Sequence, residues 1–128
     1  MDHVILGVGL DIVPIARVAA LLSRHGERAA HRLFSVGERA DCDGRAEPAQ
    51  HYAARFAAKE AVLKALGVPP GLRWVEIEVR TANTGRPVLV LSGAAAAAAA
   101  ERGVGAQHVS LTHAGGMAAA VVVLESGG

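Results

Sequence analysis

The chain has 128 residues, of which 52% are hydrophobic, 20% are charged and only 3% are aromatic, and its formal net charge is +1. This composition excludes an intrinsically disordered chain, and the near-zero net charge argues against a nucleic-acid partner. Residues 1–128 therefore suit a single domain with a modest core of small aliphatic side chains, and packing against further copies of the chain would add burial to that core.

The first third of the chain predicts one strand and two helices. Val4–Leu10 is a continuous apolar run with two glycines, which is typical of a buried strand. Pro14 suits the first residue of a helix, and apolar residues at helical spacing continue that helix to a predicted end near Gly26. Ser35–Glu38 fits a capping box, so we expect a short second helix there and a polar loop over 41–48.

The middle of the chain carries the helix with the clearest boundaries. Pro48 can open this helix, and the helix continues to about Leu66. Gly67 then provides a left-handed stop, and Pro69-Pro70 prevents continuation.

The next segments predict a hairpin and a further helix. Val75–Val79 alternates between apolar and charged residues, as a half-buried strand does, and Asn83–Gly85 is a turn before a second strand over Pro87–Leu91. The alanine run Ala94–Ala100 is a low-complexity segment that could be a linker. We expect a helix capped by Ser92, because alanine has the highest helix propensity and linkers are rich in Gly or Ser.

Two strands close the chain, over Val109–Thr112 and Met117–Leu124, on either side of Gly115-Gly116. The sum is an α+β fold: a single domain in which a mostly antiparallel sheet packs against a long central helix.

The chain also gives signals about its location. Cys42 is the only cysteine, which excludes an internal disulfide and fits a reducing compartment. Met1-Asp2-His3 lacks the basic region of a secretory signal, and no apolar run approaches the roughly 20 residues of a membrane helix. We expect a cytoplasmic protein with no membrane partner.

Three charged residues are the first candidates for chemistry. Asp11 ends the predicted strand, where it could cap the following helix or serve a site. Glu60 and Lys64 lie one helical turn apart, which could be a plain surface ion pair, but their face also carries apolar residues and so is partly buried. Mg²⁺ takes one or two protein carboxylates together with phosphate oxygens, so Asp11 and Glu60 could hold Mg²⁺ while Lys64 neutralises a phosphate.

Further basic residues could take part. Arg55 could bind phosphate in a bidentate manner, and His113, at a strand end before two glycines, could bind phosphate or ribose or be purely structural. Four arginines of the early segment would form a positive stripe on a continuous helix, suited to an acidic protein partner or simply to solvent: Arg17, Arg24, Arg28 and Arg32. Gly26 interrupts that helix.

Over nearly its full length, the chain resembles the holo-acyl-carrier-protein synthase family, the small bacterial type of 4′-phosphopantetheinyl transferase. Four segments carry the resemblance: Gly7–Val13, Arg55–Gly67, Gly85–Pro87 and Val109–His113. The second of these is the most specific. The resemblance implies an enzyme that moves the phosphopantetheine arm of coenzyme A onto a serine of an apo acyl carrier protein, in fatty-acid or polyketide synthesis, and releases adenosine 3′,5′-bisphosphate.

The resemblance also implies roles for individual residues. Asp11 and Glu60 would hold Mg²⁺, and Lys64 would contact the pyrophosphate of coenzyme A. Either Glu60 or a water that it orients would remove the serine proton. The residues implied in binding coenzyme A are Arg55, Lys64, Gly67, Arg86, Pro87, Thr112 and His113.

Partners follow from the same resemblance. Arg17 and Arg24 would meet the acidic recognition helix of the carrier protein, and the family implies a homotrimer with coenzyme A bound between subunits. Two positions depart from relatives: Val13 stands where larger members often have a third acidic ligand, and Arg86 replaces a common lysine. A non-catalytic carrier-binding module and a different Mg²⁺-nucleotide enzyme on the same fold are the alternatives.

Overall fold

A computed structural model describes residues 3–127. Its larger sheet has three antiparallel strands in the order β1-β5-β4, which are Ile5–Pro14, Met117–Ser126 and Val104–Ala114. A separate antiparallel pair joins β2 (Ile77–Thr81) to β3 (Pro87–Leu91). The predicted α+β class with antiparallel strands is confirmed, although the strands form two sheets.

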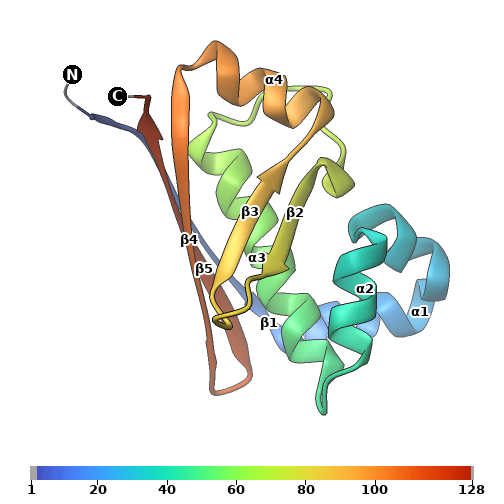
Figure 1. Ribbon diagram of the computed structural model, residues 1–128. Coiled ribbons are helices and arrows are strands. Elements are labelled where there is room, and N and C mark those ends of the chain that lie inside the picture. Colours follow the sequence, from blue (N-terminus) through green and yellow to red (C-terminus); the bar gives the residue numbers. More distant parts are fainter. Residues whose placement is uncertain (1–2, 128) are drawn as a thin grey trace.

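The helix α3 (Pro48–Ala65) is the centre of the molecule. It crosses one face of the three-stranded sheet, and the β2–β3 pair lies on its other side (Figure 1). Small side chains line its buried face, and they allow the sheet to approach closely: Ala53, Ala54, Ala57, Ala58 and Ala61. The core is therefore thin and rich in alanine, as the composition predicts.

Two glycines of β1 make this approach possible. A Cβ atom added to Gly9 would lie 1.7 Å from the carbonyl oxygen of Ala61, and one added to Gly7 would lie 2.1 Å from that of Ala65. No side chain fits in either space, so glycine is required where β1 crosses α3. The crossing brings the middle of β1 directly against the second half of α3.

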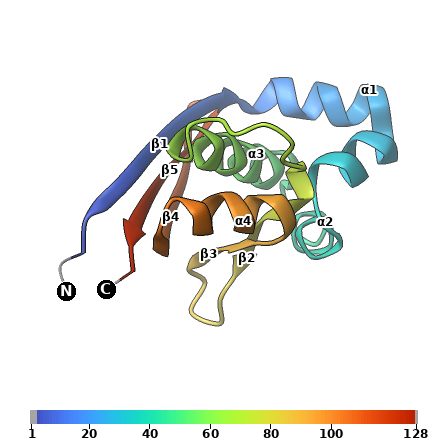
Figure 2. The ribbon, with the colours of Figure 1, turned by 90° about the horizontal axis from the view of Figure 1, so that it is seen from above.

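The remaining helices surround this centre (Figure 2). They are α1 (Ile15–Leu33), α2 (Val36–Asp43) and α4 (Gly93–Glu101), with a short 3₁₀ helix, η1, at Trp74–Glu76. The capping box of α2 and the helical state of the alanine run are both confirmed. None of the helices in residues 3–127 is both long and apolar enough to cross a membrane.

Several predicted boundaries are wrong. The first helix does not end near Gly26: that residue breaks it with a φ of 58°, and the chain then resumes a helical path to Leu33. The second helix extends to Asp43, into the predicted loop. β1 runs on to Pro14, so Asp11 lies inside the strand and not at its end.

The start of the predicted hairpin also differs. Trp74–Glu76 is helical rather than extended, and this places the Glu76 carboxylate at the beginning of α4. Its two oxygens accept hydrogen bonds from the backbone N–H groups of Arg73, at 3.0 Å, and Ala94, at 3.2 Å. Ser92, the predicted cap, makes no side-chain capping bond. A distant carboxylate therefore caps the alanine helix.

We expect Glu76→Ala to lower the melting temperature by several degrees, while Ser92→Ala, the matched control, leaves it nearly unchanged. The backbone N–H of Arg73 holds the pKa of Glu76 below its ordinary value, although burial opposes this. The stabilisation is therefore present above the ordinary glutamate pKa and disappears as the pH falls through the lowered pKa. Thermal melts of both variants at neutral and acid pH test this, and an equal effect of the two variants would contradict it.

Candidate active site

One cluster forms where β1 crosses α3. The ammonium Nζ of Lys64 lies 2.9 Å from Oδ1 of Asp11 and also donates to the backbone carbonyl of Leu10, at 3.0 Å. Asp11 is partly buried and Lys64 is exposed. The alternative that Asp11 caps the first helix is wrong, because α1 begins after Pro14 without any side-chain cap.

Glu60 lies one turn before Lys64 on the same helix and completes the cluster. Burial raises the pKa of Glu60, the negative charge of Asp11 raises it further, and Lys64 opposes both. In the described part of the chain the Glu60 carboxylate has no hydrogen-bond or ion-pair partner. The structure thus brings together Asp11, Glu60 and Lys64, as the sequence predicts.

This donor set fits a hard divalent cation. Two neighbouring carboxylates with one ammonium leave a net negative charge, and the free Glu60 oxygens have lone pairs to offer. Within residues 3–127 no group of three or more His, Cys, Asp or Glu side chains is placed to hold a metal. A cation here would take only two protein carboxylates, which matches the way Mg²⁺ binds together with phosphate oxygens and water.

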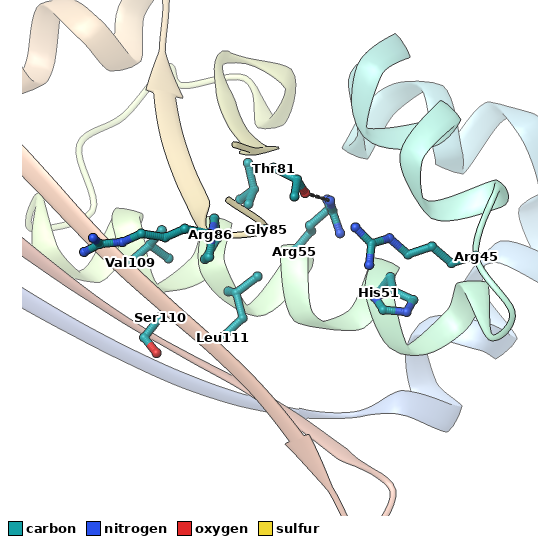
Figure 3. A pocket seen from close by; sticks show the side chains of 11 residues that line it. Arg45, His51, Arg55, Thr81, Gly85, Arg86, Val109, Ser110 and Leu111 are labelled. Atoms are coloured by element: carbon teal, nitrogen blue, oxygen red, sulfur yellow. Dashed lines mark hydrogen bonds between the residues drawn. The ribbon is translucent and has the colours of Figure 1, made fainter. Parts of the chain in front are cut away.

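A second cluster lines a cavity of about 400 Å³ between α3, the β2–β3 turn and β4 (Figure 3). Three arginines give this cavity a positive lining, and one histidine lies among them: Arg45, Arg55, Arg86 and His51. Pro87 and Gly85 form part of its wall, and no aspartate or glutamate is among its lining residues. An anionic ligand is the natural occupant.

The two inner arginines are fixed by one carboxylate. Asp41 accepts hydrogen bonds from Arg55 and, at 3.2 Å, from Arg45, and Arg55 also lies 3.4 Å from the hydroxyl of Thr81. Burial opposes the ionisation of Asp41, but the charge of Arg55 and the contacts of Arg45 hold its pKa below the ordinary value. The Nε atoms of both arginines are buried without a partner. Asp41 therefore holds both inner arginines in place at the pocket.

Three other residues that are predicted to bind coenzyme A do not line this cavity: His113, Thr112 and Gly67. His113 lines a neighbouring cavity, and its ring centroid lies 6.4 Å from that of His51. Thr112 is exposed on β4 and is not among the residues that line the arginine-rich cavity. Gly67 lies beyond the far end of α3, with a φ of 79°.

The basic residues of α1 are divided by the break at Gly26. Arg17 and Arg24 precede the break and are exposed. Arg28 and Arg32 follow it and line a mostly apolar hollow of about 420 Å³ together with Leu21, His25, Ala29, Leu33, Phe56 and Trp74. The helix is not continuous at Gly26, so the four arginines do not form one stripe, although all four are exposed.

Three residues of the second cluster were missed by the sequence reasoning: Asp41, Arg45 and His51. Asp41 and Arg45 lie in the segment 41–48, which the sequence predicts only as a polar loop and which carries no part of the family resemblance. His51 carries the one usable signal, since it precedes Arg55 by four residues on a helix and so shares its face.

Comparisons with known proteins show which family the chain resembles. The model of the 4′-phosphopantetheinyl transferase superfamily matches residues 7–122. A holo-[acyl-carrier-protein] synthase of Anaeromyxobacter dehalogenans is 50% identical over 127 residues, covering 97% of this chain and 98% of the relative. One of Frankia casuarinae is 51% identical over 122 residues, covering 95% and 98%.

Solved structures of such proteins share the fold. The holo-[acyl-carrier-protein] synthase of Helicobacter pylori, in complex with coenzyme A, superimposes with a TM-score of 0.80 at 30% identity, covering 91% of this chain and 98% of that one. The holo-ACP-synthase of Plasmodium yoelii gives 0.86 at 26% identity, covering both chains fully. With a family model that spans most of its length and relatives at half identity, this chain belongs to the 4′-phosphopantetheinyl transferase superfamily.

Proposed function

We propose that this chain transfers the 4′-phosphopantetheine group from coenzyme A to a serine of an apo acyl carrier protein. The serine oxygen forms a new bond to the phosphorus that bears pantetheine. The pyrophosphate bond to the nucleotide breaks, and adenosine 3′,5′-bisphosphate leaves. The observation that carries the proposal is the grouping of Asp11, Glu60 and Lys64 at the β1–α3 crossing of a family member.

The first cluster handles the pyrophosphate. Asp11 and Glu60 hold Mg²⁺, which when bound neutralises charge on the pyrophosphate and on the leaving phosphate. Lys64 contacts the pyrophosphate as a point charge, and its bond to Asp11 keeps it at the site. Reactions of this class need positioning and charge neutralisation more than covalent help from the protein.

The serine must lose its proton during attack. Glu60 suits this task, because its pKa is raised by burial toward the working pH and its carboxylate is free to accept. A water oriented by Glu60 is the other acceptor. Both assignments make the site sensitive to acid, since protonation of Glu60 removes a base and a cation ligand together.

The second cluster holds the nucleotide end of coenzyme A. Arg55 and Arg86 bind its 3′-phosphate, Pro87 packs beside the nucleotide, and His113 contacts it from the neighbouring cavity. The position of Arg55 at the cavity wall, where Asp41 holds it, supports this role. Thr112 and Gly67 lie outside this pocket, so they would contribute to coenzyme A bound at a boundary between subunits.

We also propose a homotrimer. The face of β1 that points away from α3 exposes large apolar side chains, which another copy would cover: Leu6, Val8, Leu10 and Ile12. Coenzyme A bound between subunits fits the exposed position of Thr112 on the same sheet. Cytoplasmic location and a role in fatty-acid synthesis stay predictions of the sequence.

The direct test is the intact mass of an apo acyl carrier protein after incubation with this chain, coenzyme A and Mg²⁺. A gain of one phosphopantetheine group that a chelator prevents would support both the reaction and its metal. No gain, with carrier binding retained, would favour the alternative of a non-catalytic module.

A further prediction concerns carrier docking. Arg24→Glu places a negative charge on the exposed face of α1, so we expect a roughly tenfold higher KM for the carrier protein and an unchanged KM for coenzyme A. Arg102→Glu, at an exposed arginine at the end of α4, is the matched control and should change neither. An equal effect of Arg24→Glu on both substrates would refute the docking role.

A further inference from the structure

His51 holds a particular place in the arginine-lined pocket. It lies near the beginning of α3, one turn before Arg55, and is only partly exposed. Figure 3 shows its ring beside the Arg45 side chain, on the same side of α3 as Arg55. A ligand phosphate that reaches the two guanidinium groups would therefore also meet this imidazole.

The charges around His51 come from every neighbouring element. Arg45 lies on the α2–α3 connection, Arg55 on α3 and His113 on β4, and across the cavity Arg86 comes from the β2–β3 turn. Asp41 of α2 is a negative group that acts on His51, and it is already bonded to both inner arginines. The lining of the pocket thus has an excess of positive charge.

This environment disfavours a proton on His51 in the free protein. Burial lowers the pKa of His51, the charges of Arg45 and Arg55 and the neighbouring His113 lower it further, and Asp41 only partly opposes them. A phosphate monoester carries close to two negative charges near neutral pH. Its arrival offsets the positive charge around His51 and favours the protonated imidazole, which then has a donor on each ring nitrogen.

We propose that His51 is a further ligand of the nucleotide 3′-phosphate and that it binds this phosphate by taking up a proton. The inference rests on the proposed function, since coenzyme A and adenosine 3′,5′-bisphosphate are the phosphate carriers concerned. It adds a proton-linked ligand to a site whose other cations, the three arginines, keep their charge at every working pH. Affinity for the nucleotide should consequently fall as the pH rises.

The test is calorimetric titration of adenosine 3′,5′-bisphosphate into the full chain, in buffers of different ionisation enthalpy at about pH 7.5, where the phosphate is mostly dianionic. The wild-type protein should take up a fraction of a proton on binding, and His51→Asn should not. His51→Asn should also bind about tenfold more weakly near pH 6.5 and nearly as well as wild type near pH 8.5. His31→Asn, at an exposed histidine of α1, is the matched control and should behave as wild type.

A second measurement needs no variant. Nuclear magnetic resonance titration of the wild-type histidines should show one pKa that rises when the bisphosphate binds, and dephospho-coenzyme A, which lacks the 3′-phosphate, should not cause that rise. Two calorimetric results would overturn the inference about His51 without contradicting the proposed transfer reaction. One is proton uptake that persists in His51→Asn, and the other is proton uptake that is lost instead in His113→Asn. Wild-type protein that neither binds the bisphosphate nor modifies a carrier protein would overturn the proposed function and this inference together.

Discussion

Glu60→Gln is expected to reduce phosphopantetheine transfer about a thousandfold or more, without loss of stability. The substitution keeps the shape of the side chain but removes the charge that would hold a cation and accept the serine proton. Loss of several kcal/mol of transition-state stabilisation gives a reduction of this size. Initial rates of transfer, measured by the mass of the carrier protein, would show the effect.

The direction in which Glu60→Gln changes the stability of the fold also follows from the pKa of Glu60. The pKa of Glu60 is raised in the folded protein, first by burial and then by Asp11. Between the ordinary glutamate pKa and this raised value the folded state binds more protons than the unfolded state, so stability falls as the pH rises through that window. Above the window the charged Glu60 weakens the fold, so Glu60→Gln should melt at the same or a higher temperature than wild type at neutral pH.

Two controls make this prediction specific. Asp11→Ala removes the other proposed cation ligand and should also abolish transfer with little change in melting temperature. Glu27→Gln, at an exposed glutamate of α1, should alter neither quantity. Near-normal transfer in both Glu60→Gln and Asp11→Ala would refute the metal assignment, whatever their stability.

Local signals account for the parts of the fold that could be predicted. The central helix was expected over Pro48 to about Leu66 and runs from Pro48 to Ala65, because a proline and a glycine mark its two ends within the sequence itself. The restart of α1 after Gly26 has no such signal: the buried Ala29 and Leu33 hold the second half of α1 against the core. Tertiary packing, and not a local sequence signal, therefore determines that α1 ends at Leu33.

The candidate site also has one part that local sequence signals predict and another part that depends on tertiary contacts. Glu60 and Lys64 are neighbours by helix periodicity, and Asp11 joins them because Gly9 lets β1 approach α3 closely. The arginine-lined pocket instead collects residues from the α2–α3 connection, α3, the β2–β3 hairpin and β4, so its assembly depends on tertiary contacts that no local sequence pattern predicts. Arg45 could be assigned to the pocket only from the fold, whereas His51 has the one sequence signal, its helical spacing from Arg55.

A buried ion pair next to the site was also invisible in the sequence. Lys59 is fully buried on α3, and its Nζ lies 2.8 Å from Oε1 of Glu38, in α2. It also donates to the backbone carbonyls of Trp74, at 3.0 Å, and Ile77. Glu38 in turn accepts from the backbone N–H of Val79, at 2.9 Å. One pair thus ties α2 and α3 to η1 and β2.

Lys59→Met is therefore expected to lower the free energy of unfolding by about 3–5 kcal/mol, the largest stability loss from one substitution that we predict. The methionine would fill much of the space but leave the Glu38 charge and two carbonyl groups buried without their partner. Urea unfolding monitored by circular dichroism measures the change. The exposed Lys64→Met, which also loses an ion pair to a carboxylate, is the matched control and should cost less than about 1 kcal/mol.

The double variant Lys59→Met/Glu38→Gln separates the two sources of this loss. If an uncompensated charge dominates, removing the Glu38 charge should restore a large part of the stability lost in Lys59→Met, and the two substitutions will not be additive. Additive losses would mean that Lys59 acts chiefly through the carbonyls of Trp74 and Ile77. A loss below about 1 kcal/mol in the free energy of unfolding of Lys59→Met alone would contradict the proposed structural role. An unpaired Glu38 charge in a core of this size should destabilise the fold by more than that.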